Sequence, residues 1–148
     1  MKIVLDTNVL VAGLLSPFGP CGDIVRMVSS GDMTLCFDAR ILSEYREALK
    51  PPKFRFAEDE IDALIDFIAI RGQAVAPSPL SKPLPGPDDE PFLEAAIAGR
   101  LSCLVTGNRA HFPGRHRQGV KVLSPREFLT RYRNLPKKTQ RRPDSGGR

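Results

Sequence analysis

Short apolar runs alternate along the chain with longer segments whose apolar side chains recur every three or four residues. The short runs are rich in β-branched and large apolar residues, which is typical of inner strands of a parallel sheet. They predict strands at 2–5, 34–37, 104–106 and 120–122. The longer segments predict amphipathic helices between them.

Capping residues mark where several of these helices begin and end. Asp23 is the predicted N-cap of a helix that Gly31 ends, and Asp38 is the predicted N-cap of a helix that the two prolines at 51–52 end. Residues 124–127, Ser-Pro-Arg-Glu, form a capping box with proline at the first helical position. These signals predict where helices start more sharply than periodicity alone.

Two further helices flank a loop rich in proline at 77–87. The helix before the loop covers 58–70 and opens with three acids, which suit the positive end of the helix dipole. The helix after it is opened by Asp88 or Asp89 and ends at Gly99. Its predicted inward positions are Leu93, Ala96 and Ile97.

The alternation of strands and helices predicts an α/β fold, a three-layer sandwich with a mainly parallel central sheet. Ligands of such sheets bind beyond the carboxyl ends of the strands, where the strand order reverses. Asp6 directly follows the first predicted strand, and Thr106 ends a later one with Asn108 just beyond it. We therefore expect these residues to open onto one crevice.

Composition limits the class of protein. The 148 residues are 41% hydrophobic and 26% charged, which is ordinary for one soluble globular domain. No apolar run approaches the roughly 20 residues that cross a bilayer. The stretch from Val9 to Leu15 is short and follows Asp6 and Asn8, unlike a secretory signal. We expect a cytoplasmic protein without a membrane partner.

Charge divides the chain into two parts. The chain has 22 basic and 17 acidic residues. Residues 131–148 hold seven of the basic residues and one of the acidic ones, so residues 1–130 hold 15 basic and 16 acidic residues. The net charge of +5 thus splits into −1 for the body and +6 for the tail. We expect a domain at 1–130 and a disordered basic tail at 131–148, which either attracts a polyanion or only aids solubility.

Cysteine usage favours a small apolar role. Cys21, Cys36 and Cys103 form no close pair, and the last two stand in strand-like surroundings. Free buried cysteine behaves as a small hydrophobe. The pattern indicates neither a disulfide framework nor a zinc site.

Two acids near the first strands have both a structural and a functional interpretation. Asp6 lies between an apolar strand and an apolar helix, where a carboxylate is costly unless it is paired, hydrogen-bonded or bound to a metal. Alternatively, its side chain caps the following helix. Glu44 lies at the edge of an apolar helix face, and a solvated surface glutamate is the simpler interpretation.

The remaining polar candidates lie later in the chain. Asp88, Asp89 and Glu90 cluster at a helix start, where dipole complementation alone accounts for them. Asn108 suits a turn, and His111 suits a hydrogen-bonded structural role.

Only the set of these acids points to chemistry. Clustered carboxylates raise one another's pKa unless a cation neutralises them, and oxygen-rich sites suit Mg²⁺ or Mn²⁺. Paired ions of this kind stabilise the attacking and leaving oxygens of phosphodiester cleavage. Glycine-rich phosphate loops and the serine-hydrolase motif are absent from the sequence.

Four motifs in this order resemble the PIN domain, closest to the toxin components of toxin–antitoxin systems. They are Ile3-Val4-Leu5-Asp6-Thr7-Asn8-Val9-Leu10, Leu42-Ser43-Glu44-Tyr45, Asp88-Asp89-Glu90-Pro91-Phe92-Leu93-Glu94-Ala95-Ala96, and Leu104-Val105-Thr106-Gly107-Asn108 followed by His111-Phe112-Pro113. The resemblance covers about residues 1–130 and implies the fold shared with 5′-nucleases.

The resemblance also implies roles for single residues. Asp6 and Asp89 would be the principal Mg²⁺ ligands, with Asp89 preferred to Asp88 because it stands three residues before Phe92. Glu44 would complete the acidic set, directly or through water.

Other roles carried by the resemblance belong to uncharged residues. Asn8 and Thr106 would position ligands or water. Asn108 takes the fourth catalytic position, where an acid is common, and His111 stands where an aspartate often precedes the phenylalanine. Asparagine neutralises no charge, so the number of bound ions is open.

The implied function is Mg²⁺-dependent endoribonuclease activity of a toxin, in which a metal-activated water attacks an RNA phosphodiester. The implied partners are RNA, a cognate antitoxin and a second copy of the chain in a homodimer. Two alternatives remain open: a PIN-fold RNA-binding or interaction module with weak or no activity, and a phosphate-transfer domain of receiver or phosphatase type. Thr7-Asn8 in place of a second aspartate counts against the latter.

Overall fold

The computed structural model describes residues 1–100 and 103–136. Its strands are β1 (Lys2–Leu5), β2 (Thr34–Phe37), β3 (Gln73–Ala74), β4 (Cys103–Val105) and β5 (Val122–Leu123). Its helices are α1 (Thr7–Leu15), α2 (Pro20–Ser30), α3 (Ala39–Leu49), α4 (Glu58–Arg71), α5 (Glu90–Gly99) and α6 (Pro125–Arg133), and short 3-10 turns η1 to η4 lie at Pro52–Phe54, Pro87–Asp89, Arg109–His111 and Gly114–His116.

The described strands form one parallel sheet in the order β3-β2-β1-β4-β5. Leu5 pairs with Val105 at the carboxyl ends of β1 and β4. From β1 the chain moves outward to β2 and β3 and then returns to the other side of β1 to form β4. The order therefore reverses between β1 and β4, which is where such sheets bind ligands.

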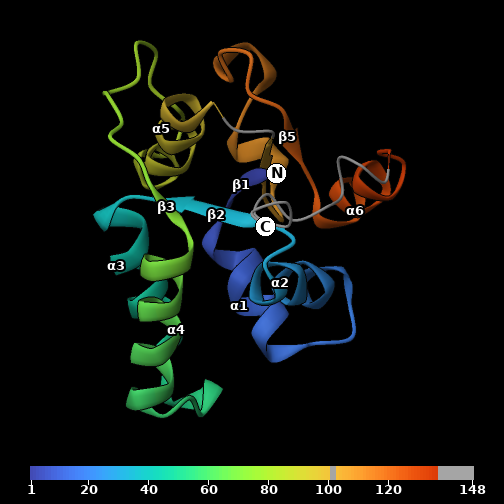
Figure 1. Cartoon of the computed structure of the whole chain (residues 1–148). Helices are drawn as coiled ribbons and strands as arrows, with labels where there is room; N and C mark the ends of the chain where they lie inside the picture. The colour runs from blue at the N-terminus through green and yellow to red at the C-terminus, as the bar shows by residue number, and fades with distance from the viewer. Residues whose placement is uncertain (101–102, 137–148) are drawn as a thin grey trace.

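Helices cover both faces of the sheet. In Figure 1, α5 lies on one side of it and α1 and α2 lie on the other, which makes three layers. Leu5, Leu104 and Leu93 are fully buried at the centre of the core. The predicted parallel α/β sandwich is confirmed.

The structure corrects several predicted elements. Helix α2 begins at Pro20 with Gly19 as its N-cap, and Asp23 lies in its first turn. The side chain of Ile97 is 37% exposed, because α5 turns it away from the core. The two later strands are shifted to 103–105 and 122–123, and β3, with both residues exposed, was not predicted.

The proposed domain boundary at residue 130 falls within α6, which runs to Arg133. Most of the predicted tail, residues 137–148, lies outside the described residues, so its disorder stays a prediction. Within the described ranges, no single helix is long and apolar enough to cross a membrane, and α1 with α2 passes that test only as a pair bent by 96°.

Candidate functional site

Asp6 and Thr106 meet at the reversal point of the sheet. The N–H of Asp6 donates to the carbonyl oxygen of Val105 over 2.9 Å, which continues the pairing of β1 with β4. The hydroxyl of Thr106 donates to Asp6 Oδ2 over 2.7 Å, and the Asp6 residue is only 6% exposed. Asp6 occupies the N-cap of α1 but makes no side-chain capping bond. Helix capping therefore does not account for this buried carboxylate.

Helix α3 brings Glu44 to the same end of β1. The hydroxyl of Thr7 donates a short hydrogen bond to Glu44 Oε2. The fully buried Tyr45 donates its hydroxyl to the carbonyl oxygen of Leu5 over 2.6 Å. These two bonds join α3 to the end of β1, and the partly buried Glu44 is turned toward Asp6 rather than left as a solvated surface residue.

Of the acids that open α5, Asp89 is the one that contacts His111. Asp88 is exposed, and Glu90 accepts a hydrogen bond from the N–H of Leu84 over 3.0 Å. Asp89 is the N-cap of α5 without a side-chain capping bond. Its Oδ2 lies 3.4 Å from Nδ1 of His111.

Asn108 and His111 complete the ring around the site. The N–H of Asn108 donates to the Thr106 hydroxyl over 3.0 Å, and Asn108 Nδ2 lies 2.8 Å from His111 Nε2. Since an amide nitrogen can only donate, the imidazole accepts at Nε2 and directs Nδ1 with its proton toward Asp89. Asp6 and Asp89 are thereby linked through three intervening residues, Thr106, Asn108 and His111, and the step from Thr106 to Asn108 uses the backbone N–H of Asn108.

Asn8 has a positioning contact on the opposite side of this loop. Its Oδ1 accepts from the N–H of Gly107 over 3.3 Å, which ties the start of α1 to the segment after β4. A Cβ at Gly107 would stand 3.4 Å from that amide. Thr7 and Tyr45 lie within the quoted motifs, but sequence reasoning gave neither a role; an unexplained hydroxyl next to Asp6 was the available signal.

The acids influence one another's ionisation. Burial raises the pKa of Asp6 more than its hydrogen bonds and His111 lower it. Burial is the first cause that raises the pKa of Glu44, and the charges of Asp6, Asp88 and Asp89 raise it further. Burial and then the charge of Asp6 raise the pKa of Asp89, against the effect of His111. Three elements thus direct negative charge into one region.

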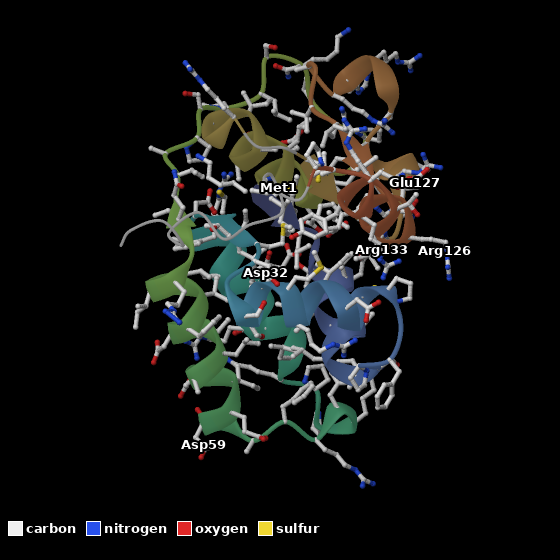
Figure 2. The ribbon with its side chains drawn as sticks, turned by 45° about the vertical axis from the view of Figure 1, so that its right-hand side comes forward. Met1, Asp32, Asp59, Arg126, Glu127 and Arg133 are labelled. Carbon is white, nitrogen blue, oxygen red and sulfur yellow. The ribbon has the colours of Figure 1, made fainter. Side chains whose placement is uncertain are left out.

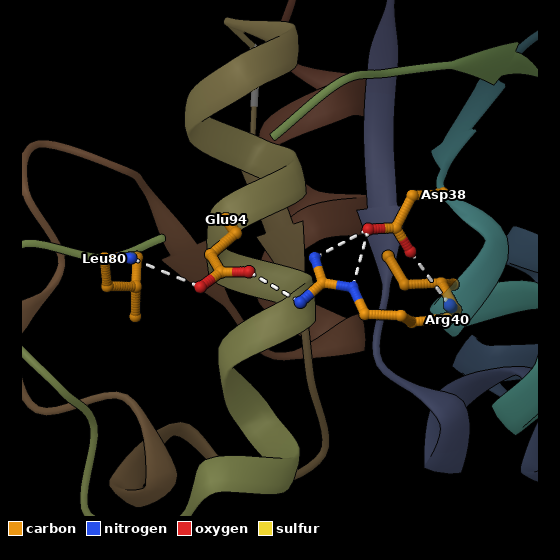
Figure 3. Close-up of polar contacts among 5 residues, drawn as sticks. Asp38, Arg40, Leu80 and Glu94 are labelled. Carbon is orange, nitrogen blue, oxygen red and sulfur yellow. Dashed lines mark hydrogen bonds and ion pairs between the residues drawn. The ribbon is translucent and has the colours of Figure 1, made fainter. Parts of the chain in front are cut away.

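A buried acid elsewhere in the fold is neutralised, which makes the contrast informative. Figure 3 shows Arg40 between Asp38 and Glu94, with N–O distances of 2.6 and 2.7 Å. Glu94 also accepts from the N–H of Leu80 over 3.2 Å, so the pair anchors the proline-rich loop. In the described part of the chain, neither Asp6 nor Glu44 has such an Arg or Lys partner.

The donor set suits a divalent ion, although the ligands are not gathered around one point. No three His, Cys, Asp or Glu side chains within 1–100 and 103–136 lie near enough to hold an ion together. The carboxylates of Asp6, Glu44 and Asp89 share an electrostatic environment without forming a closed cluster. Their oxygens are the ligands that Mg²⁺ and Mn²⁺ prefer, and a divalent ion would offset the burial of these carboxylates, which is the first cause of their raised pKa values, and the repulsion that adds to it at Glu44 and Asp89. The residues present therefore fit such an ion.

Solved structures with the same fold include complexes bound to DNA. The chain is similar to one in VapBC2 from Rickettsia felis bound to a promoter DNA fragment, with 16% identity, a TM-score of 0.56, and 84% and 98% of the two chains covered. It is also similar to a chain in FitAB bound to the IR36 DNA fragment, with 18% identity and a TM-score of 0.58, and the match covers 83% of this chain and 94% of that chain. A chain in FitAcB from Neisseria gonorrhoeae is similar at 18% identity with a TM-score of 0.53, and the match covers 83% of this chain and 97% of that chain.

Sequence comparison identifies the family directly. The search among curated proteins found no match. The profile of the PIN domain matches residues 2–110, a range that contains Asp6, Glu44, Asp89 and Asn108. This chain belongs to the PIN domain family.

Proposed function

We propose that this protein is a Mg²⁺-dependent endoribonuclease that acts as the toxin of a toxin–antitoxin system. One observation carries the proposal: burial raises the pKa of three carboxylates from three elements at the sheet's reversal point, the charge of Asp6 raises those of Glu44 and Asp89 further, and none of the three has a Lys or Arg partner among the described residues. Such an arrangement disfavours the folded protein unless a cation is bound. We therefore expect this arrangement of carboxylates in a protein whose function uses the bound cation.

Asp6 and Asp89 would be the principal ligands of Mg²⁺ or Mn²⁺, and Glu44 would act directly or through water. The ion would supply the Lewis acidity that activates water and offsets charge on the phosphate. Thr106 fixes the orientation of the Asp6 carboxylate, and Thr7 fixes that of Glu44. The chain thus orients its ligands before substrate binds.

The residues around the ligands have positioning roles. Asn8 holds the loop after β4 through Gly107, so it supports the position of Thr106. Asn108 stays at the fourth catalytic position, where its amide oxygen is a neutral ligand or a hydrogen-bond acceptor for RNA. Its amide nitrogen is engaged by His111.

The proposed partners are RNA, a cognate antitoxin and a second copy of the chain. Two similar structures are named as the complexes VapBC2 and FitAB, which supports an antitoxin partner. Leu15 is 44% exposed and Phe18 is 96% exposed at the turn between α1 and α2, which offers apolar surface to a protein partner. A toxin that cuts cellular RNA would act in the cytoplasm.

The test is cleavage of a single-stranded RNA by the purified protein with Mg²⁺ or Mn²⁺ and with EDTA. Asp6→Asn, Glu44→Gln and Asp89→Asn are each expected to lose about 100-fold or more in kcat/KM. Glu47→Gln, one turn along α3 from Glu44, and Asp88→Asn are the matched controls and are expected to retain activity. Equal cleavage by Asp6→Asn and the unaltered chain would contradict the proposal.

A PIN-fold RNA-binding module with little activity is the second candidate. Asn108 and His111 favour it, because the fourth position holds no negative charge. Mn²⁺ titration separates the two functions independently of turnover: the nuclease binds the ion and loses affinity in Asp89→Asn, whereas the module binds RNA equally with and without the ion.

A further inference from the structure

Charge is segregated across the sheet, with the carboxylate site between the two halves. Helix α4, which leads to the β3 edge, carries five Asp or Glu residues. Residues 107–126, which run from the loop after β4 through β5 to the second residue of α6, carry five Arg or Lys residues and no Asp or Glu. We call residues 107–126 the basic segment. Figure 1 shows it in orange beside β5, away from the green α4.

The basic segment starts at the carboxylates themselves. Asn108 and His111 belong to it, and His111 lies 3.4 Å from Asp89. Arg109, the next cation in the sequence, stands between Asn108 and His111 and pairs with Glu127 of α6. A polyanion lying along this segment would reach the acids without crossing the acidic α4.

The backbone of the segment is preformed. Two 3-10 turns, Arg109–His111 and Gly114–His116, shape it, and the fully buried Phe112 anchors it in the core. Arg117 donates from Nε to the carbonyl oxygen of Phe112 over 2.6 Å. Arg117 thus stabilises the loop, whereas Arg109, Arg115 and Arg126 are exposed, with Arg115 donating from Nε to His116 Nε2 over 3.3 Å.

The exposed arginines are available to a ligand. Arg109 pairs with Glu127 at 3.3 Å, but both side chains are about half exposed, 52% and 43%, so the pair is weak. Arg115 and Arg126 are exposed, and Figure 2 shows Arg126 extending outward from α6 beside Glu127. Guanidinium groups bind phosphate oxygens with directional hydrogen bonds.

We propose that the basic segment binds the phosphate backbone of single-stranded RNA and brings it to the carboxylates from the β5 edge of the sheet. This inference rests on the proposed function. An RNA strand fits better than an acidic protein, because none of the exposed large hydrophobic side chains of the described residues, Leu15, Phe18, Ile70 and Ile97, belongs to the segment, and Phe18 borders it at Arg126, with which it lines one hollow. Protein interfaces are centred on apolar and aromatic side chains, whereas phosphate tracks are polar and rich in arginine.

The test uses the full chain with Asp6→Asn, so that RNA binds without being cut, and a fluorescently labelled 20-nucleotide RNA. Arg109→Gln with Arg115→Gln removes two charges from the segment. The control pair Lys50→Gln with Lys53→Gln removes two charges from the end of α3 and the turn after it. Thermal unfolding of each variant confirms that it is folded, and Arg109→Lys with Arg115→Lys tests whether charge alone restores binding.

The arginine pair is expected to weaken RNA binding about tenfold and to reduce the slope of log affinity against log salt by about 1.4, or 0.7 for each lost phosphate contact. The lysine control should stay within about twofold of the parent. Unchanged affinity for RNA and an unchanged salt slope in the arginine pair would overturn the inference. An arginine pair that binds RNA normally but no longer binds an acidic protein partner would also overturn it. The arginine pair is also made in the chain that keeps Asp6; if that variant cuts RNA with the same KM as the unaltered chain, only this inference fails. If RNA binds as expected but is never cut with any divalent ion, only the proposed function fails.

Discussion

Asp6 and Thr106 are 100 residues apart in the chain and share a buried hydrogen bond of 2.7 Å. The same hydroxyl oxygen accepts from the N–H of Asn108 over 3.0 Å. A single side chain therefore orients the buried carboxylate and shapes the loop that follows β4. This double use makes Thr106 the most sensitive uncharged position in the site.

Thr106→Val should destabilise the protein by about 2–3 kcal/mol, because the isosteric methyl leaves Asp6 and the N–H of Asn108 without their partner. The pKa of Asp6 should rise further, since its largest lowering contribution is lost. Urea unfolding measures the first effect. Thr106→Ser keeps the hydroxyl and loses only the methyl group, so it should be destabilised much less than Thr106→Val; a Thr106→Val variant as stable as the unaltered protein would show that these hydrogen bonds contribute little.

Asp6→Asn should stabilise the metal-free protein by roughly 1 kcal/mol while abolishing cleavage. The amide keeps an acceptor for the Thr106 hydroxyl and removes the cost of burying a charge. Thermal unfolding with EDTA, compared with activity in Mg²⁺, measures both effects. A less stable Asp6→Asn variant would show that the carboxylate is well stabilised without an ion.

The stability gained in Asp6→Asn should depend on pH. The folded-state pKa of Asp6 lies above its unfolded value, so the folded protein binds more protons in this range and loses stability as the pH rises through the folded pKa. The gain should therefore be small near pH 4 and grow toward pH 7. Urea unfolding of both proteins across this range, with chelator present, measures it; a gain that shrinks with rising pH would reverse the sign of the shift.

Tyr45→Phe should destabilise the protein by about 1 kcal/mol, since the buried hydroxyl donates to the carbonyl oxygen of Leu5 over 2.6 Å. The bond joins α3 to β1 one residue before Asp6. Because Thr7 still holds Glu44, kcat should change less than the unfolding free energy implies. An unchanged unfolding midpoint would contradict this account.

His111→Ala should lower kcat/KM about tenfold, because Asp89 loses the side chain that orients it. His111 is about half exposed, so the unfolding free energy should change by less than about 0.5 kcal/mol. His116→Ala, in the same segment, is the control, because the His116 ring bonds to Arg115 and to no acid among the described residues. Equal activity of the two variants would remove His111 from the positioning residues.

The fold was predictable where chemistry and periodicity agree. The run 2–5 followed by an acid gave the end of β1, and the strand predicted at 104–106 placed the end of β4 within one residue of Val105; parallel pairing brings these two ends together. Strand β3 carried no signal: Gln73 and Ala74 are both exposed, and the strand exists because β2 offers it an edge.

The site was less predictable because its orientation depends on hydrogen bonds between distant elements. The contact of Thr7 with Glu44 joins residues that are 37 positions apart in the sequence. The contact of His111 with Asp89 joins two loops. The start of α2 was wrong because Pro20 after Gly19 competes with Asp23, and proline is stable in the first turn.

Because Leu5 pairs with Val105, the hydrogen bond between Asp6 and Thr106 forms only when β1 and β4 pair in the correct register. Sliding β4 by one residue moves it about 3.3 Å and reverses which way its side chains face. Thr106 would then turn its hydroxyl away from Asp6, and an anion would be stranded in the apolar interior. Selection for the proposed RNA cleavage would therefore also favour sequences in which the two central strands, β1 and β4, pair in the correct register.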